Sequence, residues 1–417
     1  MRMDRSLRPL APAIGLCLLV LVIALGVVAQ TAPRYRFDPD WPKTMPNKWK
    51  IGGVTGLAVD KDDNVWVLNR PNDLRDMELR AETNTVDCCV RPPAMIHIDK
   101  AGNVIGSFDP PQGHGMAVDS QGFVYVGNSV RGLDTVRKYD PKTGMMLKEI
   151  PHATEVQGGG GGGDAAPAAR QPGRGGPGPT GTFPQQGGGR GGANPEAQAA
   201  AAAALAVFQA KYPPTSPMIV GGVEEIRLDE PAREMYVADS YLGGRVMVFD
   251  LDTFEFKRGW GAYGHTLAQI TTNPADRLYT PGGPMPKEFR GHLTLNFSKD
   301  GKVYAADRAA NRIHVTDKQG KFEREIVVAP TSGGGSTGGV AFSPDPQQRY
   351  LFISDLNNNT IWFLNRADGA LVGRLGSMGE NGGQFFGLHM IAVDSTGNIY
   401  TGEVFNGERV QRFVPVR

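Results

Sequence analysis

One unit recurs along the chain and constrains its fold more than any other feature. Each copy starts with glycine, continues with a short apolar run and a polar turn, and ends with a second apolar run. The copies read GGVTGLAVDKDDNVWVLNR, GHGMAVDSQGFVYVGNS, GGVEEIRLDEPAREMYVADSY, GHLTLNFSKDGKVYAADR, GGVAFSPDPQQRYLFISDL and GLHMIAVDSTGNIYTGEV. The runs alternate apolar and polar residues and break at Gly, Asn and Asp, as strands and turns do. Repeats of about 40–50 residues with four strands each are typical of propeller blades. The sequence therefore predicts an all-β, six-bladed β-propeller.

The ring is expected to close with a strand from near the N-terminus. The sixth blade, which ends in ERVQRFVPVR, is short of one strand. We expect the stretch APRYRFDPDW, residues 32–41, to supply it. This assigns blades one and two, with the closing strand, to residues 30–152, and blades three to six to residues 218–417.

Residues 153–217 differ in composition from the blades. Their first part, which includes QGGGGGGDAAPAARQPGRGGPGPTG, cannot bury enough apolar surface to fold, so we expect a disordered, low-complexity surface insertion. The alanine-rich stretch that follows, PEAQAAAAAALAVFQAKY, predicts a short helix starting at Pro195.

Residues 1–29 have the features of an export signal. Arg2, Arg5 and Arg8 form a basic head, and an apolar run follows from Leu10 to Ala29. A cleaved signal peptide and an uncleaved membrane anchor both remain open, and either places the folded part outside the cytoplasm, periplasmic or secreted. There a disulfide is allowed, so the adjacent Cys88 and Cys89 could form a bridge or stay as free thiols.

Charge excludes two classes of partner. The chain has 44 basic and 43 acidic side chains, a net charge of +1, so nothing general attracts it to nucleic acid or to an anionic membrane. We expect a monomer that takes a small-molecule or peptide substrate and meets a membrane only through its N-terminal segment.

Three of the seven histidines occupy the same point of the repeat. The first strand of each blade lines the central channel, so equivalent positions form a ring around the axis. That position carries Thr55, His114, Glu224, His292, Gly338 and His389. Histidine thus appears in alternate blades, and three neutral imidazoles converging on the axis suit Zn²⁺ with a fourth position open to water or substrate. His114, His292 and His389 are the predicted metal ligands.

Further candidate residues follow the second strand of three blades. Arg70 ends it in blade one, Arg308 follows it in blade four, and Tyr241 follows it in blade three. Two arginines and a tyrosine around a metal would make an anion-binding mouth with a proton-transfer group.

These motifs carry two resemblances. The copies containing Asp239, Asp307 and Asp355 resemble the NHL repeat, in which that Asp sits at a turn between strands. The stretches HGMAVD, GHLTLNFSKDGKVYAADR, LHMIAVDSTGNIYTGE, VTGLAVDKDDNVWVLNR and VADSYLGGR together resemble the peptidyl-α-hydroxyglycine α-amidating lyase family, whose members are six-bladed propellers.

The second resemblance implies an activity and roles for the site residues. Members of that family cleave a carbinolamide to a peptide amide and glyoxylate. Carried over, the histidines at 114, 292 and 389 bind zinc, Arg70 and Arg308 hold the substrate carboxylate, and Tyr241 assists removal of the hydroxyl proton. Met390 stands where the family has a calcium-binding carboxylate, which puts a structural calcium in doubt, and the chain has no oxygenase domain to make the hydroxyglycine.

Two other interpretations remain open from the sequence. One is a non-catalytic NHL propeller that binds a protein or glycan, with the histidines incidental or structural. The other is a gluconolactonase-like hydrolase, which ranks lowest because such enzymes hold calcium with axial carboxylates and amides, whereas this ring is rich in histidine.

Overall fold

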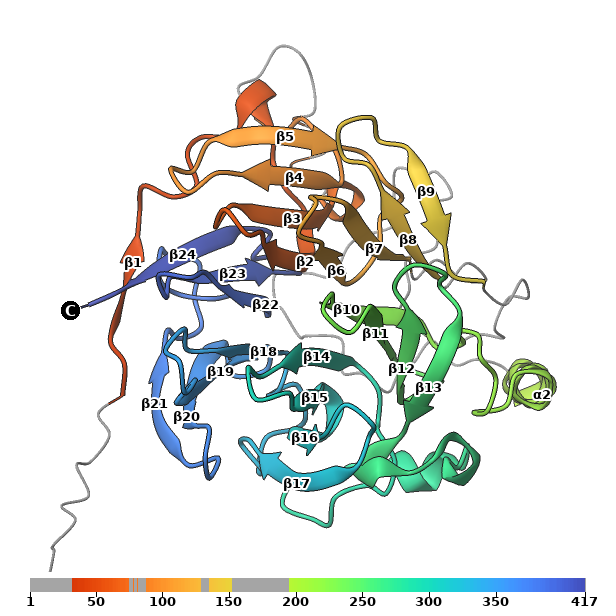
Figure 1. Cartoon of the computed structure of the whole chain (residues 1–417). Coiled ribbons are helices and arrows are strands. Elements are labelled where there is room, and N and C mark those ends of the chain that lie inside the picture. Colours follow the sequence, from red (N-terminus) through yellow and green to blue (C-terminus); the bar gives the residue numbers. More distant parts are fainter. Residues whose placement is uncertain are drawn as a thin grey trace, which may run out of the picture. The chain divides into compact units, whose positions relative to one another are not determined.

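Six four-stranded antiparallel sheets form a ring in the computed structural model (Figure 1). The structure describes residues 32–74, 78, 81, 88–128, 135–151 and 195–416. From the inside outwards, the first three blades are β2 (Gly53–Val59), β3 (Val65–Arg70), β4 (Met95–Ile98) and β5 (Val104–Phe108); β6 (Met116–Val118), β7 (Val124–Asn128), β8 (Thr135–Tyr139) and β9 (Met146–Glu149); and β10 (Val223–Asp229), β11 (Glu234–Asp239), β12 (Arg245–Asp250) and β13 (Phe256–Trp260).

The other three blades have the same order. They are β14 (Leu293–Phe297), β15 (Val303–Asp307), β16 (Arg312–Thr316) and β17 (Phe322–Val327); β18 (Gly339–Phe342), β19 (Tyr350–Asp355), β20 (Thr360–Asn365) and β21 (Leu371–Leu375); and β22 (Leu388–Val393), β23 (Ile399–Glu403), β24 (Val410–Pro415) and β1 (Tyr35–Asp38). Short 3-10 helices connect them: η1 (Pro46–Lys48), η2 (Pro71–Asp73), η3 (Ala262–Gly264), η4 (Leu267–Gln269), η5 (Pro274–Arg277) and η6 (Arg308–Ala310). The predicted all-β six-bladed propeller is confirmed.

Burial follows the position of each strand in its blade. The second strands β11, β15, β19 and β23 are buried along their whole length, because each is covered by a blade on either side. The outer strands β13, β17 and β21 keep exposed positions. Six apolar clusters each join two neighbouring blades, so the core consists of the blade interfaces and contact between blades stabilises the ring.

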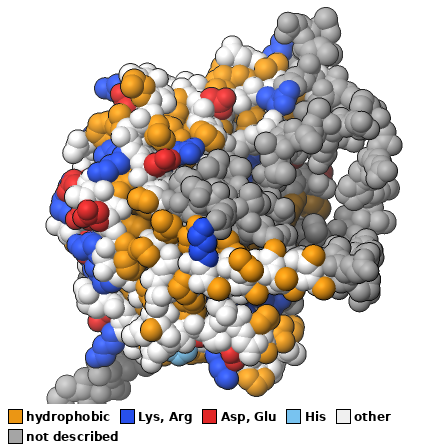
Figure 2. Space-filling model, turned by 90° about the vertical axis from the view of Figure 1, so that its right-hand side faces the viewer, with side chains coloured by type: hydrophobic (Ala, Val, Ile, Leu, Met, Phe, Trp, Pro, Cys, Tyr) orange, Lys and Arg blue, Asp and Glu red, His pale blue; other side chains and the backbone are white. Residues whose placement is uncertain are grey.

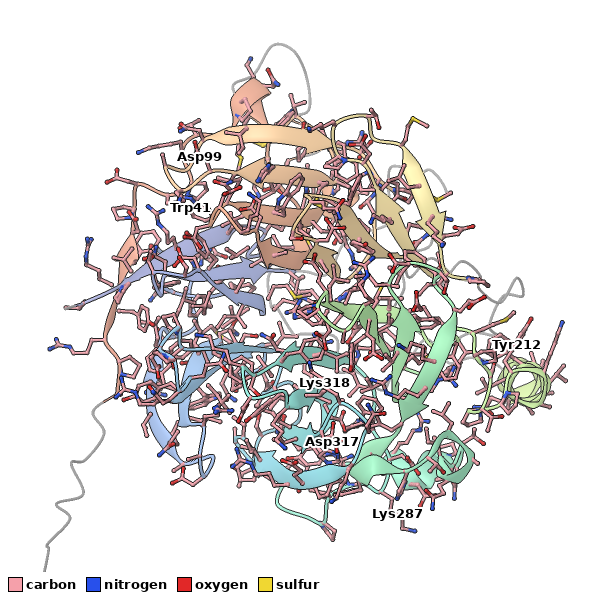
Figure 3. All side chains as sticks on the ribbon, viewed as in Figure 1. Trp41, Asp99, Tyr212, Lys287, Asp317 and Lys318 are labelled. Atoms are coloured by element: carbon pink, nitrogen blue, oxygen red, sulfur yellow. A yellow bond between two sulfur atoms is a disulfide. The ribbon has the colours of Figure 1, made fainter. Side chains whose placement is uncertain are left out.

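The N-terminal strand closes the ring as predicted. β1 pairs antiparallel with β24, with Phe37 opposite Phe413. The innermost strands contact one another in chain order, and β22 contacts β2. Trp41, beyond β1, is 2% exposed, and its indole Nε1 donates to the carbonyl oxygen of Asp99 in blade one at 3.1 Å (Figure 3). The N-terminal segment therefore ties the sixth blade to the first.

The predicted helix of the insertion is present as α2 (Pro195–Lys211) and starts at Pro195. Near its end the buried Phe208 packs with Tyr212, Val220 and Leu242. Leu242 directly follows the candidate residue Tyr241 in the chain. The glycine-rich part, residues 152–194, lies outside the described residues.

Other sequence expectations have mixed outcomes. Cys88 and Cys89 form a disulfide.

The expected signal segment, residues 1–29, lies outside the described residues. Among the residues that the structure describes, no helix is long and apolar enough to cross a membrane. On the face shown in Figure 2, basic and acidic side chains are interspersed, in keeping with the near-zero net charge.

Candidate functional site

The ring positions lie where the inner strands begin, and β-bulges mark three of them. In β2, β10 and β22 the pairing with the next strand skips one residue, which is Thr55, Glu224 and His389 respectively. A bulge takes a residue out of the ladder and redirects its side chain. The local backbone therefore releases Glu224 and His389 from the alternation that would otherwise fix their direction.

His114 and His292 are placed by turns just ahead of their strands. The amide of His114 donates to the Gly127 carbonyl at 2.8 Å, and Gly115 follows with a φ of +73°. His292 itself has a φ of +56°, a left-handed conformation uncommon for a residue with a side chain. Such conformations concentrate at functional sites, where the surrounding structure holds them.

Two predicted ligands face each other directly. Nε2 of His114 lies 3.3 Å from Nε2 of His389, and their ring centroids are 4.9 Å apart. Two nitrogens that share one tetrahedral zinc ion, each at about 2.0–2.1 Å, lie about 3.3–3.4 Å apart. Nδ1 of His389 is buried and finds no hydrogen-bond partner among the described residues. The pair therefore has the spacing of two ligands of one metal ion.

The third histidine joins this pair through a carboxylate. Nδ1 of His292 lies 2.7 Å from Oε1 of Glu224, and that oxygen lies 3.9 Å from Nε2 of His114. Within the described parts of the chain, no group of three or more His, Cys, Asp or Glu side chains is already disposed to hold a metal ion. The residues thus fit a metal in their donor types and in one ligand pair, and the third histidine is linked to that pair through Glu224.

Tyr241 and Arg308 belong to the same cluster. The Tyr241 hydroxyl donates to Glu224 Oε1 at 2.8 Å, and the tyrosine ring lies edge-on to His292 with centroids 4.5 Å apart. Arg308, at the start of η6, contacts His292 Nδ1, and its Nη2 lies 3.9 Å from Glu224 Oε1. The structure therefore brings five of the six predicted residues into one group, in which His114, His389 and Arg308 are buried and Tyr241 and His292 are half-buried.

Arg70 lies at the edge of this group. It ends β3, its side chain is 18% exposed, and its Nη1 is 4.0 Å from Asp73 Oδ2. Its charge contributes to lowering the pKa of His114 and His389. Arg70 is thus close enough to act on the axial histidines electrostatically and more open to solvent than Arg308.

Burial and the two arginines keep the histidines neutral. Burial first, and then the cations, lower the pKa of His114 to about 4 and that of His389 well below its ordinary value. The pKa of His292 is lowered by burial and by Arg308. Neutral imidazoles keep a lone pair for a metal ion.

The pKa values of the Glu224 carboxylate and the Tyr241 phenol are shifted in opposite directions. Burial raises the pKa of Glu224, but the hydrogen bond with His292 and the charge of Arg308 outweigh burial and lower that pKa well below its usual range. Burial and the neighbouring Glu224 raise the pKa of Tyr241 well above its ordinary value. Near neutral pH the site therefore holds an ionised carboxylate and a protonated phenol.

Glu224 is the residue whose importance sequence reasoning missed. The repeat pattern places this acidic residue at a ring position among histidines, but it does not indicate what the carboxylate does there. A signal was available, because a carboxylate at a position that points to the axis must find partners or shift its pKa.

The comparisons with known proteins bear on the fold. No family model matches the chain. Over 201 residues, 46% of the chain, it is 27% identical to NHL repeat-containing protein 3 from Homo sapiens, of which the match covers 51%. The chain thus spans about half the length of the curated relative it matches.

Two solved structures are also similar. A structural genomics protein of unknown function from Bacteroides thetaiotaomicron VPI-5482 matches with a TM-score of 0.50 and 13% identity, over 93% of this chain and 73% of that one. Virginiamycin B lyase from Staphylococcus aureus matches with a TM-score of 0.43 and 11% identity, over 88% and 87%. The second score is too low to bear on this chain. The first structure supports the fold alone, the human relative adds a partial likeness to an NHL-repeat protein, and neither says anything about the chemistry of this chain.

Proposed function

We propose that this protein is an exported, zinc-dependent lyase that cleaves the C–N bond of an α-hydroxyglycine, giving an amide and glyoxylate. The observation that carries the proposal is the group on the propeller axis. It contains a pair of histidines, His114 and His389, at metal-ligand spacing. Beside them, the protonated Tyr241, the third histidine, His292, and Arg308 lie around the carboxylate of Glu224. These groups suit a small anionic substrate with a hydroxyl group.

The metal would be held by the histidines at 114, 292 and 389. Zinc bound there would act as a Lewis acid on the substrate oxygens. The low pKa values of these imidazoles favour metal binding, because no proton has to leave first at neutral pH.

The arginines would hold the substrate carboxylate. Arg308 is 6% exposed, and its anionic neighbour among the side chains of the cluster is Glu224. A guanidinium can bind a carboxylate with two parallel hydrogen bonds, which fixes orientation as well as charge. Arg70, at the more open edge, would meet the substrate as it enters.

Tyr241 would donate a hydrogen bond to the reacting oxygen or nitrogen. Its phenol is protonated in the resting site, so it can supply a proton to the departing amide nitrogen. In the reaction the substrate hydroxyl passes its proton to the Tyr241 oxygen as that oxygen gives its own proton to the nitrogen, so the phenol is restored, and the hydroxyl oxygen becomes the aldehyde oxygen of glyoxylate. The electrons of the C–N bond go to the amide nitrogen, which gains one proton. Protons and electrons therefore balance without an oxidant or reductant.

Glyoxylate release from an N-acyl-α-hydroxyglycine by the zinc-loaded protein tests the proposal. His389→Ala should abolish release, because it removes one of the paired nitrogens. His265→Ala is the matched control: that histidine is 33% exposed, contacts Glu288 and lies outside the ring, so release should continue.

Absence of release from the parent protein would refute the lyase proposal. The chain would then be treated as a propeller that binds a protein or glycan. Equal loss in His389→Ala and in the control would show that the loss is not specific to the axial group and would leave the proposal without support.

A further inference from the structure

We propose that Glu224 is the positioning residue of the candidate metal centre, which sets the orientation and tautomer of two of its three histidines. It does so with two different groups, the main-chain carbonyl and the side-chain carboxylate. The inference rests on the metal centre of the proposed function and does not depend on the substrate.

The first contact is between the carbonyl of Glu224 and His114. Nδ1 of His114 lies 2.9 Å from that oxygen. A carbonyl oxygen only accepts, so Nδ1 must carry the proton, and Nε2 keeps the lone pair. That Nε2 is the atom facing His389. The contact therefore presents to the partner histidine the nitrogen that a metal would need.

The second contact is between the carboxylate and His292. An ionised carboxylate also only accepts, so the 2.7 Å contact places the proton of His292 on Nδ1 and the lone pair on Nε2. Metal-ligating histidines commonly give their other N–H to a carboxylate or a carbonyl, and Glu224 supplies one of each.

Arg308 competes for the same edge of His292. It contacts Nδ1 as well, and a guanidinium is purely a donor. If Arg308 donated to Nδ1, the proton of His292 would sit on Nε2 and block metal binding there. We expect the carboxylate to bond to Nδ1 of His292, because it is an anion within hydrogen-bond distance of that nitrogen. It also lies 3.9 Å from Arg308, so it can accept from both donors.

The backbone around Glu224 is built to hold it. The bulge in β10 removes the residue from the ladder, while its neighbours on both sides stay paired with β11. Gly115 lies against its carbonyl so closely that a β-carbon there would come within 2.7 Å of the oxygen. Tyr241 gives the carboxylate a further donor at 2.8 Å. Glu224 is 1% exposed, so neither of its groups depends on solvent.

Zinc affinity, measured by competition with a chromogenic chelator, gives the first test. Glu224→Ala should weaken zinc binding about 10- to 100-fold, the usual effect of removing a partner of a ligating histidine. Glu224→Gln keeps an acceptor for Nδ1 and should recover part of that loss. Glu225→Gln is the matched control, since the carboxylate of this neighbour pairs with Arg227 at 2.8 Å. Its zinc affinity should stay within about twofold of the parent.

Nitrogen-15 NMR of the histidine rings gives the second test and separates positioning from general stability. The parent should show His114 and His292 with the proton on Nδ1. In Glu224→Ala only His292 should lose this preference, because the contact to His114 uses the main-chain carbonyl, which remains. A structural collapse would alter both rings.

Three results would overturn the inference: zinc affinity unchanged in Glu224→Ala, a proton on Nε2 of His292 in the parent, or a parent that binds no zinc. Zinc binding that responds to Glu224 without any glyoxylate release would instead refute the lyase proposal and leave the positioning role intact.

Discussion

Replacing Tyr241 with phenylalanine removes one oxygen atom from the centre of the site. The hydroxyl donates to Glu224 Oε1 at 2.8 Å, and the ring packs edge-on against His292. Phenylalanine keeps the ring and the β-carbon, so the left-handed backbone at this position, with a φ of +46°, should be unaffected. The change therefore isolates the hydrogen bond and the phenolic proton.

The expected loss of stability follows from the charge of the acceptor. A hydrogen bond to an ionised group contributes about 1.5–3 kcal/mol, which is roughly 10- to 100-fold in the unfolding equilibrium. Glu224 keeps its contacts with His292 and Arg308, so the loss should lie at the lower end. If Tyr241 transfers the proton to the leaving nitrogen, the glyoxylate rate should fall much further, by about 10²- to 10⁴-fold.

A second tyrosine in the same blade provides a matched control. The hydroxyl of Tyr236 donates to Glu234 Oε2 at 2.9 Å, also in a buried position but away from the axis. Tyr236→Phe should lower the denaturation midpoint by a similar amount and leave glyoxylate release intact. The reasoning is refuted if both variants lose activity equally, or if Tyr241→Phe keeps the parental rate.

Three further predictions concern one residue that contacts the site and two features that stabilise the propeller. Gly115→Ala should weaken zinc binding in the chelator assay, because the new methyl group would push against the carbonyl of Glu224; unchanged affinity would contradict the contact. The side-chain hydrogen bond from Arg258 lowers the pKa of Glu234 to about 2, so this carboxylate stabilises the fold above pH 4.5 and the contribution is lost as the pH falls from 4.5 towards 2. The shift corresponds to about 3 kcal/mol before solvent screening of this partly open ion pair, so Glu234→Gln should cost roughly 2 kcal/mol at pH 7, and thermal midpoints should converge with the parent in acid; a constant gap would contradict this. Deleting Tyr35–Asp38 should lower the melting temperature by exposing the edge of β24, and an unchanged temperature would show that the ring does not need this strand.

The six-fold repeat made most of the fold predictable. Each blade repeats the same glycine, apolar run and turn, so strand order and ring closure follow from the pattern, including the contribution of residues 35–38 to the last blade. Periodicity also placed His114, His292 and His389 at equivalent points, because equivalent positions of a closed ring must face a common axis. The helix at Pro195 followed from local composition alone.

The contacts inside the site could not be predicted in this way. The skipped residues in β10 and β22 depend on pairing with the next strand, and a bulge leaves no reliable mark in a single sequence. Aligning the six copies of the repeat placed Glu224 on the ring. It gave no indication that Tyr241, His292 and Arg308 would all lie against its carboxylate.

The sequence by itself determined the number of blades, their closure and the residue types that reach the axis, since these follow from periodicity and chain connectivity. Only the tertiary structure decided which of those residues touch. His114 and His389 are 275 positions apart and meet at 3.3 Å because the ring closes. The charge state of the group depends on burial and on distances between side chains from different blades, and these quantities exist only once all six blades have packed together.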